Sequence, residues 1–507
     1  MKNICSFISC MLLFVALAHG QVEGDNVFES DQILGVDISF YNSNFWTLLN
    51  DEYDGDQNYI PAGISITTTD GTLELDSVGI RLKGNSSMMH PGDKKPFKVD
   101  FNRFIAGQSY DLLKKLNFNN GFKDPTFVRE KVFYDVCEAA GILSPRATFA
   151  EVTFNGAPWG FYTVVEQIDD QFLDRSIGDD EGHLFKAGSN FGGGDGEASL
   201  VYLGPDQAPY EDAYELKQNV SDDWSDLIDL IAFINTASDD EFETQLADHL
   251  DLTPYLRSAA LDNLFSNLDT YTLSARNYYL YHNMTTNRWQ WIKWDSNETF
   301  GSYAFGVPGD MAELDLDFDG GNENRPLLKR IMESDALRAA YHSEMCWLRE
   351  NWFNPEFIEP RLDELKELVQ EAVYADDNKM FSNNQFENNF NSNQGGMGGT
   401  LYGLKPFVED RVDYIDNNLV CTSALNPLAE AHKLPLTVYP NPAINLLQID
   451  VGGEQTNLRI FNTNGQLVHS ELQSQHWAIN VREWPRGVYL VVVETDQRIQ
   501  SSRIFLK

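Results

Sequence analysis

The chain has 507 residues, 42% hydrophobic and 12% aromatic, which is enough for about two to four domains with sizeable cores and argues against wholesale disorder. Its 77 acidic residues outnumber its 37 basic ones, giving a formal net charge of −40. Such a surface repels nucleic acid and anionic membranes, so we expect neither as a partner. It suits a soluble exported protein or one that binds divalent cations.

The N-terminus, residues 1–20, has the pattern of a signal peptide. Lys2 is followed by an apolar core over 8–18, and Ala18-His19-Gly20 is a small-x-small cleavage site before Gln21. No later run reaches the roughly 18 apolar residues of a membrane span. We therefore expect an exported mature chain without a transmembrane segment. It keeps three cysteines, which allow at most one internal disulfide and form no cysteine zinc motif.

The first half of the mature chain is predicted to be rich in strands. A helix over 127–140 should end at Gly141, a residue type that favours the left-handed turn after a helix. A hairpin should join 149–154 to 160–167 through a turn that begins at Asn155-Gly156 and is longer than two residues. Further short strands are expected over 33–66, 78–82, 97–101 and 184–186.

The second half is predicted to be mainly helical. Residues 381–399 are low in complexity, and we expect them to form an exposed loop before a linker over 421–435. Strands followed by helices indicate an α+β fold rather than a doubly wound sheet. The helical stretches are expected at 222–265, 325–348, 355–374 and 404–419.

An aromatic hairpin lies inside this helical half and carries polar residues at its ends. Asp269 precedes a short loop, Asn277 stands ahead of one strand, and Asp295 ends the next, over 289–294. Two acids and an amide placed in this way can hold a metal beside a reacting phosphate. The alternative is a hairpin whose acids are simply solvated.

The last part, 436–507, has short strands and turns spaced as in a small β-sandwich. Its motifs are Y-P-N-P at 439–442, N-T-N-G at 462–465, R-G-V-Y-L at 486–490 and a basic last residue. This stretch resembles the C-terminal sorting domain of type IX secretion. The resemblance implies passage across the outer membrane by that secretion machinery, followed by release or surface attachment.

The region from about 33 to 419 carries a second set of motifs. It resembles the spore coat protein H-like (CotH) kinases, a family of atypical secreted protein kinases. Six segments carry the resemblance: K-G-N-S-S (83–87), K-K-P-F-K (94–98), F-K-D-P-T-F-V-R-E-K (122–131), N-G-A-P-W-G-F-Y-T-V-V-E-Q-I-D (155–169), W-I-K-W-D (291–295) and N-R-P-L-L-K-R-I-M (324–332).

The resemblance implies a kinase-like core at 21–420 that binds ATP with Mg²⁺ or Mn²⁺ and phosphorylates serine or threonine on exported proteins. Asp269 matches the catalytic aspartate of the family, Asp295 its metal-binding aspartate, and Asn277 a residue on the metal side. The family's R-G-N-S motif has Lys83 in place of its arginine here, which exchanges a bidentate fork for a point charge. Family membership does not by itself guarantee catalysis.

The charge of ATP points to further candidates, because a net-acidic enzyme must gather cations around the phosphates. Lys186 could pair with Glu166 as the lysine–glutamate couple of kinases does, and Tyr162 and Trp294 could flank the adenine. Surface charge or core packing is the alternative for each of them. The proposed phosphate-binding residues are Lys83, Asn85, Ser86, Lys95 and Lys98.

An acidic stretch at 315–320 reads D-x-D-x-D-G, like the first half of a calcium loop. The twelfth position falls on Pro326, where an EF-hand requires a bidentate glutamate, so the EF-hand is excluded. An irregular Ca²⁺ site at Asp315, Asp317 and Asp319 remains an alternative to a solvated loop.

Two other functions stay open beside a secreted kinase. One is a non-catalytic surface protein on a kinase-like scaffold, acting in adhesion or envelope assembly. The other is a protein that binds or degrades glycans, for which exposed aromatics such as Trp159 and Trp289 would be needed. Nucleotide binding separates the kinase from both.

Overall fold

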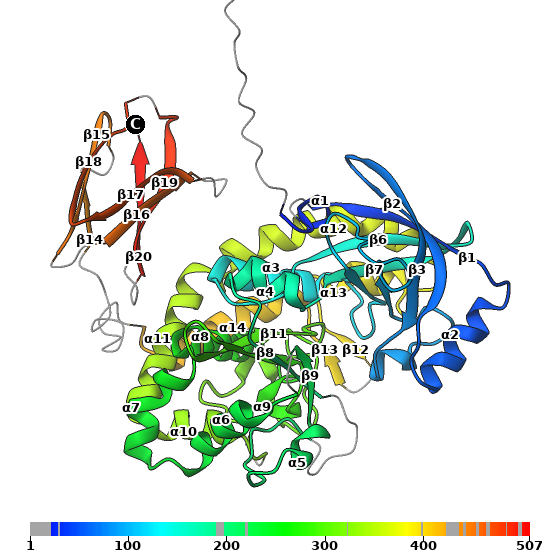
Figure 1. Cartoon of the computed structure of the whole chain (residues 1–507), viewed down its shortest axis with the longest axis horizontal. Coiled ribbons are helices and arrows are strands. Elements are labelled where there is room, and N and C mark those ends of the chain that lie inside the picture. Colours follow the sequence, from blue (N-terminus) through cyan, green and yellow to red (C-terminus); the bar gives the residue numbers. More distant parts are fainter. Residues whose placement is uncertain are drawn as a thin grey trace, which may run out of the picture. The chain divides into compact units, whose positions relative to one another are not determined.

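The computed structural model describes residues 22–28, 31–188, 197–218, 222–321, 323–396, 399–421, 436–439, 443–452, 456–462, 467–482, 484–494 and 499–506. The predicted signal peptide and nearly all of the predicted linker lie outside these residues. The chain divides into two compact units, Met1–Val420 and Cys421–Lys507, which we treat separately (Figure 1).

The first unit begins with a closed seven-stranded barrel, drawn from blue to cyan in Figure 1. Apolar side chains such as Val36, Ile64 and Phe118 fill its interior, as the alternating pattern of the strands requires. The barrel closes through a parallel pairing of its first and sixth strands. Its order is β1 (Ile33–Phe40), β2 (Ile60–Thr68), β3 (Gly71–Leu82), β4 (Phe97–Asp100), β5 (Lys115–Asn119), β7 (Ala157–Glu166) and β6 (Ala147–Phe154).

The turn between β6 and β7 is shorter than predicted. Asn155 (φ 52°) and Gly156 (φ 76°) form a two-residue turn with both residues left-handed, the geometry that matches the twist of paired strands. β7 starts directly at Ala157, and Pro158 pairs with Thr153 next to a shift in register. Because an irregular position tolerates a residue without an N–H, Pro158 does not prevent the strand from forming.

Short helices surround the barrel, and α3 (Arg129–Ala140) is the longest of them. It ends at Gly141 (φ 68°), as predicted, but it begins two residues later than expected because Phe127 has φ 61°. Asp124 accepts hydrogen bonds from the backbone N–H of Thr126 and Arg129, which fixes the entry to α3. The others are α1 (Asp25–Phe28), α2 (Phe45–Asp54), η1 (Ser86–Met89) and α4 (Asp170–Ile177).

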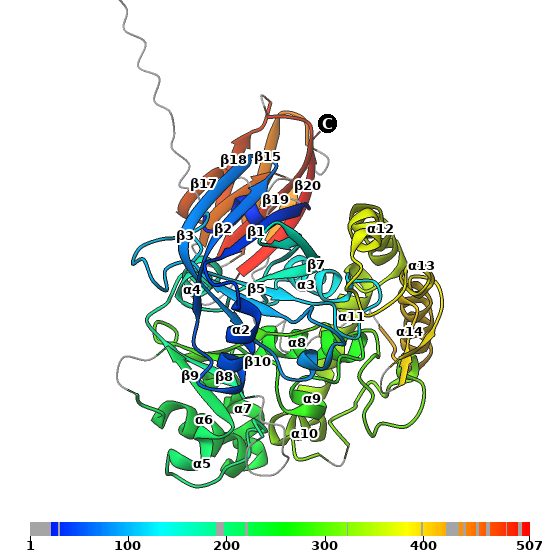
Figure 2. The same cartoon turned by 90° about the vertical axis from the view of Figure 1, so that its right-hand side faces the viewer.

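The second half of this unit contains a four-stranded sheet among helices. The sheet runs in the order β11 (Arg288–Lys293), β10 (Tyr278–Asn283), β8 (His183–Ala187) and β9 (Tyr214–Gln218). Figures 1 and 2 show these strands in green beneath the barrel. Helices on this side are α5 (Ala208–Glu211), α6 (Ser225–Thr236), α7 (Asp239–His249), α8 (Leu252–Leu264) and α9 (Tyr271–Ser274).

The remaining helices complete one large apolar core. Helix α12 (Pro355–Ala375) contacts α3 and β7, and so packs the helical part against the barrel (Figure 2). The predicted helix over 325–348 is two helices separated by Ser334, whose side chain caps the second. The elements are η2 (Met311–Glu313), α10 (Pro326–Glu333), α11 (Asp335–Asn351) and α14 (Leu404–Asn418).

The prediction of an exposed loop over 381–399 is wrong. Helix α13 (Asn383–Asn389) starts with a capping box between Ser382 and Gln385, and Phe386 and Phe390 are buried in the core. A small hairpin, β12 (Gln394–Gly396) and β13 (Gly399–Leu401), follows. Two aromatic residues at helical spacing outweigh the polar composition of the segment.

The cysteines differ in state. Cys346 and Cys421 are disulfide-bonded. Cys137, in the last turn of α3, is a free and fully buried thiol whose pKa is raised by burial.

The second unit consists of two small antiparallel sheets around a common core that includes Leu447, Trp477 and Val491. This is the all-β arrangement predicted for 436–507. One sheet comprises β14 (Leu436–Tyr439), β15 (Leu446–Val451) and β18 (His476–Asn480). The other comprises β17 (Leu467–Ser474), β16 (Thr456–Asn462), β19 (Gly487–Glu494) and β20 (Ile499–Leu506).

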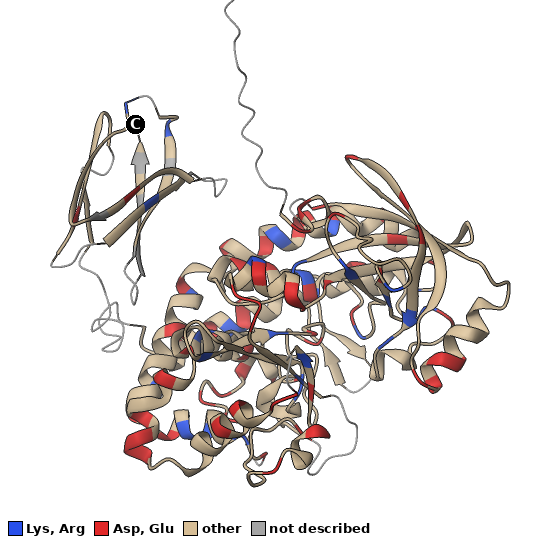
Figure 3. Cartoon of the chain, in the orientation of Figure 1, with Lys and Arg blue, Asp and Glu red and all other residues tan. Residues whose placement is uncertain are grey.

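The fold is thus a mixed α and β architecture with a barrel. Acidic positions gather on elements such as α7 (Figure 3). Within the described residues, no helix has the length and apolar character needed to cross a membrane.

Candidate functional site

A polar cavity of about 320 Å³ lies in the first unit, with walls from the barrel, α3 and the ends of the four-stranded sheet. Most of the site residues predicted from sequence line it, although they come from positions up to 212 residues apart, from Lys83 to Asp295. They are Lys83, Asn85, Ser86, Lys98, Lys186, Asp269, Asn277, Trp294 and Asp295.

Asn277 and Asp295 lie at the same end of the β10–β11 hairpin. Tyr278 pairs with Lys293 in the ladder, so the residue before β10 and the second residue after β11 are brought to one edge. Both have left-handed backbones, with φ of 61° for Asn277 and 53° for Asp295. Asn and Asp adopt this conformation at lower cost than other residues with a Cβ, and such backbones concentrate at functional sites.

Asp269 lies between α8 and α9 and is held by Asn277. The Asn277 side-chain amide donates to the Asp269 carbonyl oxygen at 2.7 Å and to Asp269 Oδ2 at 3.1 Å. Asp269 Oδ1 is buried and accepts no hydrogen bond from the described residues, and Arg276 Nε lies 4.0 Å from it. Burial raises the pKa of Asp269, and the nearby charge of Asp295 adds to the rise. One oxygen is thereby oriented while the other is left available to a ligand.

A buried ion pair beneath these residues fixes their position. Lys293, on β11, is paired with Asp262, on α8, and the two side chains are 1% and 7% exposed. The other oxygen of Asp262 accepts a hydrogen bond of 2.9 Å from the Asn267 side chain. The pair therefore ties the hairpin to the segment that carries Asp269.

Glu298 follows Asp295 by three residues and also lines the cavity. Lys123 donates to both of its carboxylate oxygens at 3.0 Å. Burial and the charge of Asp269 nevertheless raise the pKa of Glu298 to about 7. Several carboxylates thus repel one another here, which favours a bound cation.

Besides Lys217, which is paired with Glu215, three lysines line the same cavity: Lys83 after β3, Lys98 on β4 and Lys186 on β8. Burial lowers the pKa of Lys83 to about 8, and burial together with the other two lysines holds the pKa of Lys98 well below its usual range. The pKa of Lys186 is also lowered by burial. Among the ion pairs of the described residues, within 4.0 Å, none involves these three lysines. Lys98 donates instead to Gln167 Oε1 at 2.7 Å.

Trp294 lies between two of these lysines. The Nζ atoms of Lys83 and Lys186 are each 5.7 Å from the centroid of its ring, within the range of a cation–π contact. The ring is 9% exposed. Trp294 thus stabilises the lysines and leaves little surface for stacking on an adenine.

The segment after β3 is shaped by Gly84 and braced by Lys95. Gly84 has φ 91°, and a Cβ there would lie 2.2 Å from Ser87 Oγ, so a side chain would force the loop open. Lys95 Nζ donates to the carbonyl oxygens of Met88 at 2.8 Å and His90 at 2.6 Å. Lys95 therefore holds the loop that carries Asn85 and Ser86 and does not line the cavity.

Two other predicted residues also lie outside the cavity lining. The predicted Glu166–Lys186 pair does not form, because the Glu166 carboxylate is bound by Arg146 and Arg175, each at 2.8 Å. Tyr162 is fully buried in the barrel, and its hydroxyl donates to the Lys95 carbonyl oxygen at 3.1 Å. It is a core residue rather than an adenine contact.

Sequence reasoning missed Glu130, an acid that lines the cavity, whereas the predicted Glu166 does not. Glu130 lies in the first turn of α3 and accepts hydrogen bonds from Asn119 at 2.8 Å and Tyr134 at 3.2 Å. Burial and Asp295 raise the pKa of Glu130 to about 7, and Lys83 opposes the rise. The signal was an acid between Arg129 and Lys131 at the start of a helix, a pattern that usually marks a solvated face.

These residues fit a polyphosphate with a divalent cation. Three lysines without ion-pair partners would be compensated by phosphate oxygens, and Asp269 Oδ1, Asp295, Asn277 and Glu298 offer the hard oxygen ligands that Mg²⁺ or Mn²⁺ prefers. The acids do not form a closed cage. Among the described residues, the one group of at least three His, Cys, Asp or Glu ligand atoms within 4.8 Å of one another lies elsewhere, at His183, Asp226 and His282.

The three acids predicted as an irregular Ca²⁺ site are engaged locally. Asp315 and Asp319 each accept a backbone N–H at 3.0 Å, from Asp317 and Gly321. Asp317 is bonded to the His342 ring. Calcium at this loop stays a prediction.

Comparison with known proteins places both units. Residues 80–415 match the family of the CotH kinase protein, and residues 437–507 match the secretion system C-terminal sorting domain. Inner spore coat protein H of Bacillus subtilis (strain 168) is 27% identical over 288 residues, which is 56% of this chain and 74% of the relative. The twitchin kinase region of C. elegans covers 89% of this chain and 88% of its own at 9% identity, with a TM-score of 0.19, too low to bear on the fold. The chain belongs to the CotH kinase family and carries a C-terminal sorting domain of a secretion system.

Proposed function

We propose that the protein is a metal-dependent protein kinase that transfers the γ-phosphate of ATP to serine or threonine of exported or surface proteins. One observation carries the proposal: three lysines that have no ion-pair partner among the described residues line the same cavity as Asp269, Asp295, Glu130 and Glu298. Buried lysines without ion-pair partners, placed beside several buried acids, are costly unless a ligand neutralises both kinds of charge. A nucleotide with its metal does so.

The roles of the residues follow from their surroundings. Lys83, Lys98 and Lys186 would hold phosphate oxygens, assisted by backbone N–H groups around Asn85 and Ser86. Asp295 and Asn277, with Glu298 nearby, would hold a Mg²⁺ or Mn²⁺ ion, which when bound neutralises charge that develops on the phosphates.

Asp269 would orient the acceptor hydroxyl and accept its proton. Its raised pKa suits an acid that takes up a proton during the reaction, and Asn277 keeps its Oδ2 in one orientation. Glu130 would take the part first expected of Glu166, positioning Lys83 through its charge.

We further propose that the protein is exported by type IX secretion and acts outside the cell or on its surface. The sorting-domain match supports this, and the signal peptide expected at residues 1–20 is consistent with it. The relative is a spore coat protein, and that role belongs to the relative alone.

The test is a transfer assay with radiolabelled ATP and Mg²⁺ or Mn²⁺, using the full chain with casein as a generic acceptor. Asp269→Asn should lower transfer by about 10²- to 10⁴-fold while nucleotide affinity and Tm stay nearly unchanged, because only the proton acceptor is removed. Asp295→Ala should instead lose the metal-dependent part of nucleotide binding.

Asp319→Asn is the matched control, since it removes an acid that does not line the cavity. Full transfer by both cavity variants would refute the assignment of the site. Neither label nor a nucleotide-dependent shift in Tm would favour the non-catalytic scaffold instead.

A further inference from the structure

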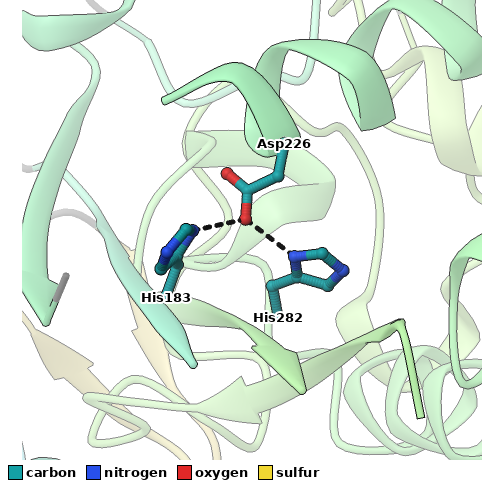
Figure 4. Close-up of side chains that lie close together, drawn as sticks. All are labelled: His183, Asp226 and His282. Carbon is teal, nitrogen blue, oxygen red and sulfur yellow. Dashed lines mark hydrogen bonds and ion pairs between the residues drawn. The ribbon is translucent and has the colours of Figure 1, made fainter. Parts of the chain in front are cut away.

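A second cluster of ligating side chains lies at the four-stranded sheet, away from the cavity. Asp226 Oδ2 is 2.6 Å from His183 Nδ1 and 2.7 Å from His282 Nδ1, as Figure 4 shows. None of the three residues lines the cavity. The cluster therefore has no part in the function proposed above and can be judged by its own chemistry.

Three separate elements bring these side chains together. His183 and His282 are directly opposite each other on the antiparallel strands β8 and β10. Asp226 comes from the first turn of α6, where its Oδ1 accepts the Leu227 backbone N–H at 2.8 Å. That bond directs Oδ2 toward the two imidazoles. The ring of His282 also stacks on Trp289 at a centroid distance of 4.7 Å, which limits its rotation.

The donor set is selective. Two imidazole nitrogens and one carboxylate oxygen within 4.8 Å of one another suit Zn²⁺ and similar late divalent ions, whereas Mg²⁺ and Ca²⁺ prefer oxygen ligands only. Zn²⁺ with three protein ligands takes a water as its fourth. The side chains are 18%, 16% and 12% exposed for His183, Asp226 and His282, so solvent can supply that water and the ion can enter.

We propose that His183, Asp226 and His282 bind a Zn²⁺ ion that braces β8 and β10 against α6. Both strands continue toward the cavity: Lys186 is on β8, and Asn277 immediately precedes β10. An ion at the opposite end of the strands fixes their register and the start of α6 together. Its expected effect is on stability rather than on the chemistry of the cavity.

The test is a calorimetric titration of Zn²⁺ into the full chain, after chelation and dialysis, in excess Mg²⁺. We expect one saturable binding event and a rise in Tm with Zn²⁺. Asp226→Asn should weaken Zn²⁺ binding by about 100-fold or more, since a ligand is lost. Asparagine keeps an oxygen that accepts hydrogen bonds from both imidazoles, so this variant should fold. The double variant His183→Gln, His282→Gln should abolish binding.

His476→Ala is the matched control, because His476 is also bonded to an aspartate, Asp450, yet belongs to no three-ligand group among the described residues. It should keep the binding event, as should Asp295→Ala, which alters the cavity. Absence of saturable Zn²⁺ binding in the unmodified chain would overturn the proposal. Equal Zn²⁺ affinity of Asp226→Asn would overturn it too. The three residues would then only hold β8, β10 and α6 together by hydrogen bonds.

Discussion

In the part of the chain that the structure describes, buried charges around the cavity are paired, whereas several of those that line it are not. Around the cavity, Lys293 is paired with Asp262, and Glu166 with Arg146 and Arg175. Inside it, Lys83 lacks an ion-pair partner within 4.0 Å among the described residues, and Glu130 has a pKa raised to about 7. Buried ion pairs tie elements of the fold together, whereas buried charges without an ion-pair partner are expected to be neutralised by a ligand. The difference tells structural from functional charges where the residue types alone do not.

The largest expected effect is the loss of stability when one member of a buried ion pair is removed. Lys293→Met should lower the free energy of unfolding by about 3–5 kcal/mol, because it leaves Asp262 charged and buried without compensation. Urea denaturation of both proteins measures the loss. The double variant Lys293→Met, Asp262→Leu should recover much of it. An unchanged midpoint in the single variant would contradict the structural role of the pair.

Two glutamates provide a direct comparison. Glu166→Gln should cost about 2–4 kcal/mol of stability, because two arginines lose their carboxylate. Glu130→Gln should cost little, since glutamine is uncharged and the carboxylate is held at a raised pKa. Urea denaturation and the transfer assay together distinguish the structural glutamate from the functional one. Glu166→Gln should lower stability, and Glu130→Gln should lower phosphate transfer. The reverse result would break the distinction between paired and unpaired charge.

The acids with raised pKa values also predict how stability depends on pH. The pKa values of Glu130 and Glu298 are raised from 4.5 to about 7, so between these values the folded state keeps protons that the unfolded state has lost. Stability should therefore fall as pH rises from about 4.5 to 7, by up to about 3 kcal/mol for each acid that titrates independently. For Lys83, lowered from 10.5 to about 8, the contribution should rise between pH 8 and 10.5.

Tm measured against pH for the ligand-free chain, beside the double variant Glu130→Gln, Glu298→Gln, tests the acid part of this prediction. The fall should be smaller in the variant and in saturating Mg²⁺, which favours the ionised acids. The same slope in all three samples would show that these two acids are not the cause.

The smallest expected effect is on the affinity for nucleotide. Lys83→Met should weaken ATP binding about tenfold through the loss of one charged contact, while stability stays equal or increases. Fluorescence titration with a nucleotide analogue measures the affinity. Lys217→Met is the control, because Lys217 lines the cavity but is already paired with Glu215. Equal losses of ATP affinity in both variants would show that a lysine without an ion-pair partner contributes no more to nucleotide binding than a paired one.

The sequence pointed to the residues whose position depends on local order and missed those that depend on distant partners. Asp269, Asn277 and Asp295 could be placed together because a hairpin brings its two ends to one edge. Glu166 and Glu130 could not be told apart, because the two arginines that bind Glu166 come from other elements of the chain. Arg146 and Arg175 lie on either side of Glu166 in sequence, and their spacing does not predict that they form ion pairs with it.

The same limit explains the errors in the fold. Asparagine and glycine dominate 381–399, so composition suggested a loop, yet Phe386 and Phe390 find places in a core that composition does not reveal. The β6–β7 turn was expected to be longer than two residues because Ala157, Pro158 and Trp159 follow Asn155-Gly156, and a register shift next to Pro158 lets the strand begin at once. Composition reflects the local preferences of a segment, whereas its secondary structure also depends on the core against which it packs.

The rate at which the buried Cys137 is labelled can report how often α3 opens. It is the free cysteine of the described chain, has no exposed surface, and sits on α3, the helix that begins with Glu130 at the cavity. A thiol reagent can modify it only during the rare openings in which α3 separates from its neighbours, so the labelling half-time counts those openings. A ligand that spans the cavity should lengthen that half-time, which makes labelling a screen for nucleotides and metals that needs no knowledge of the acceptor protein.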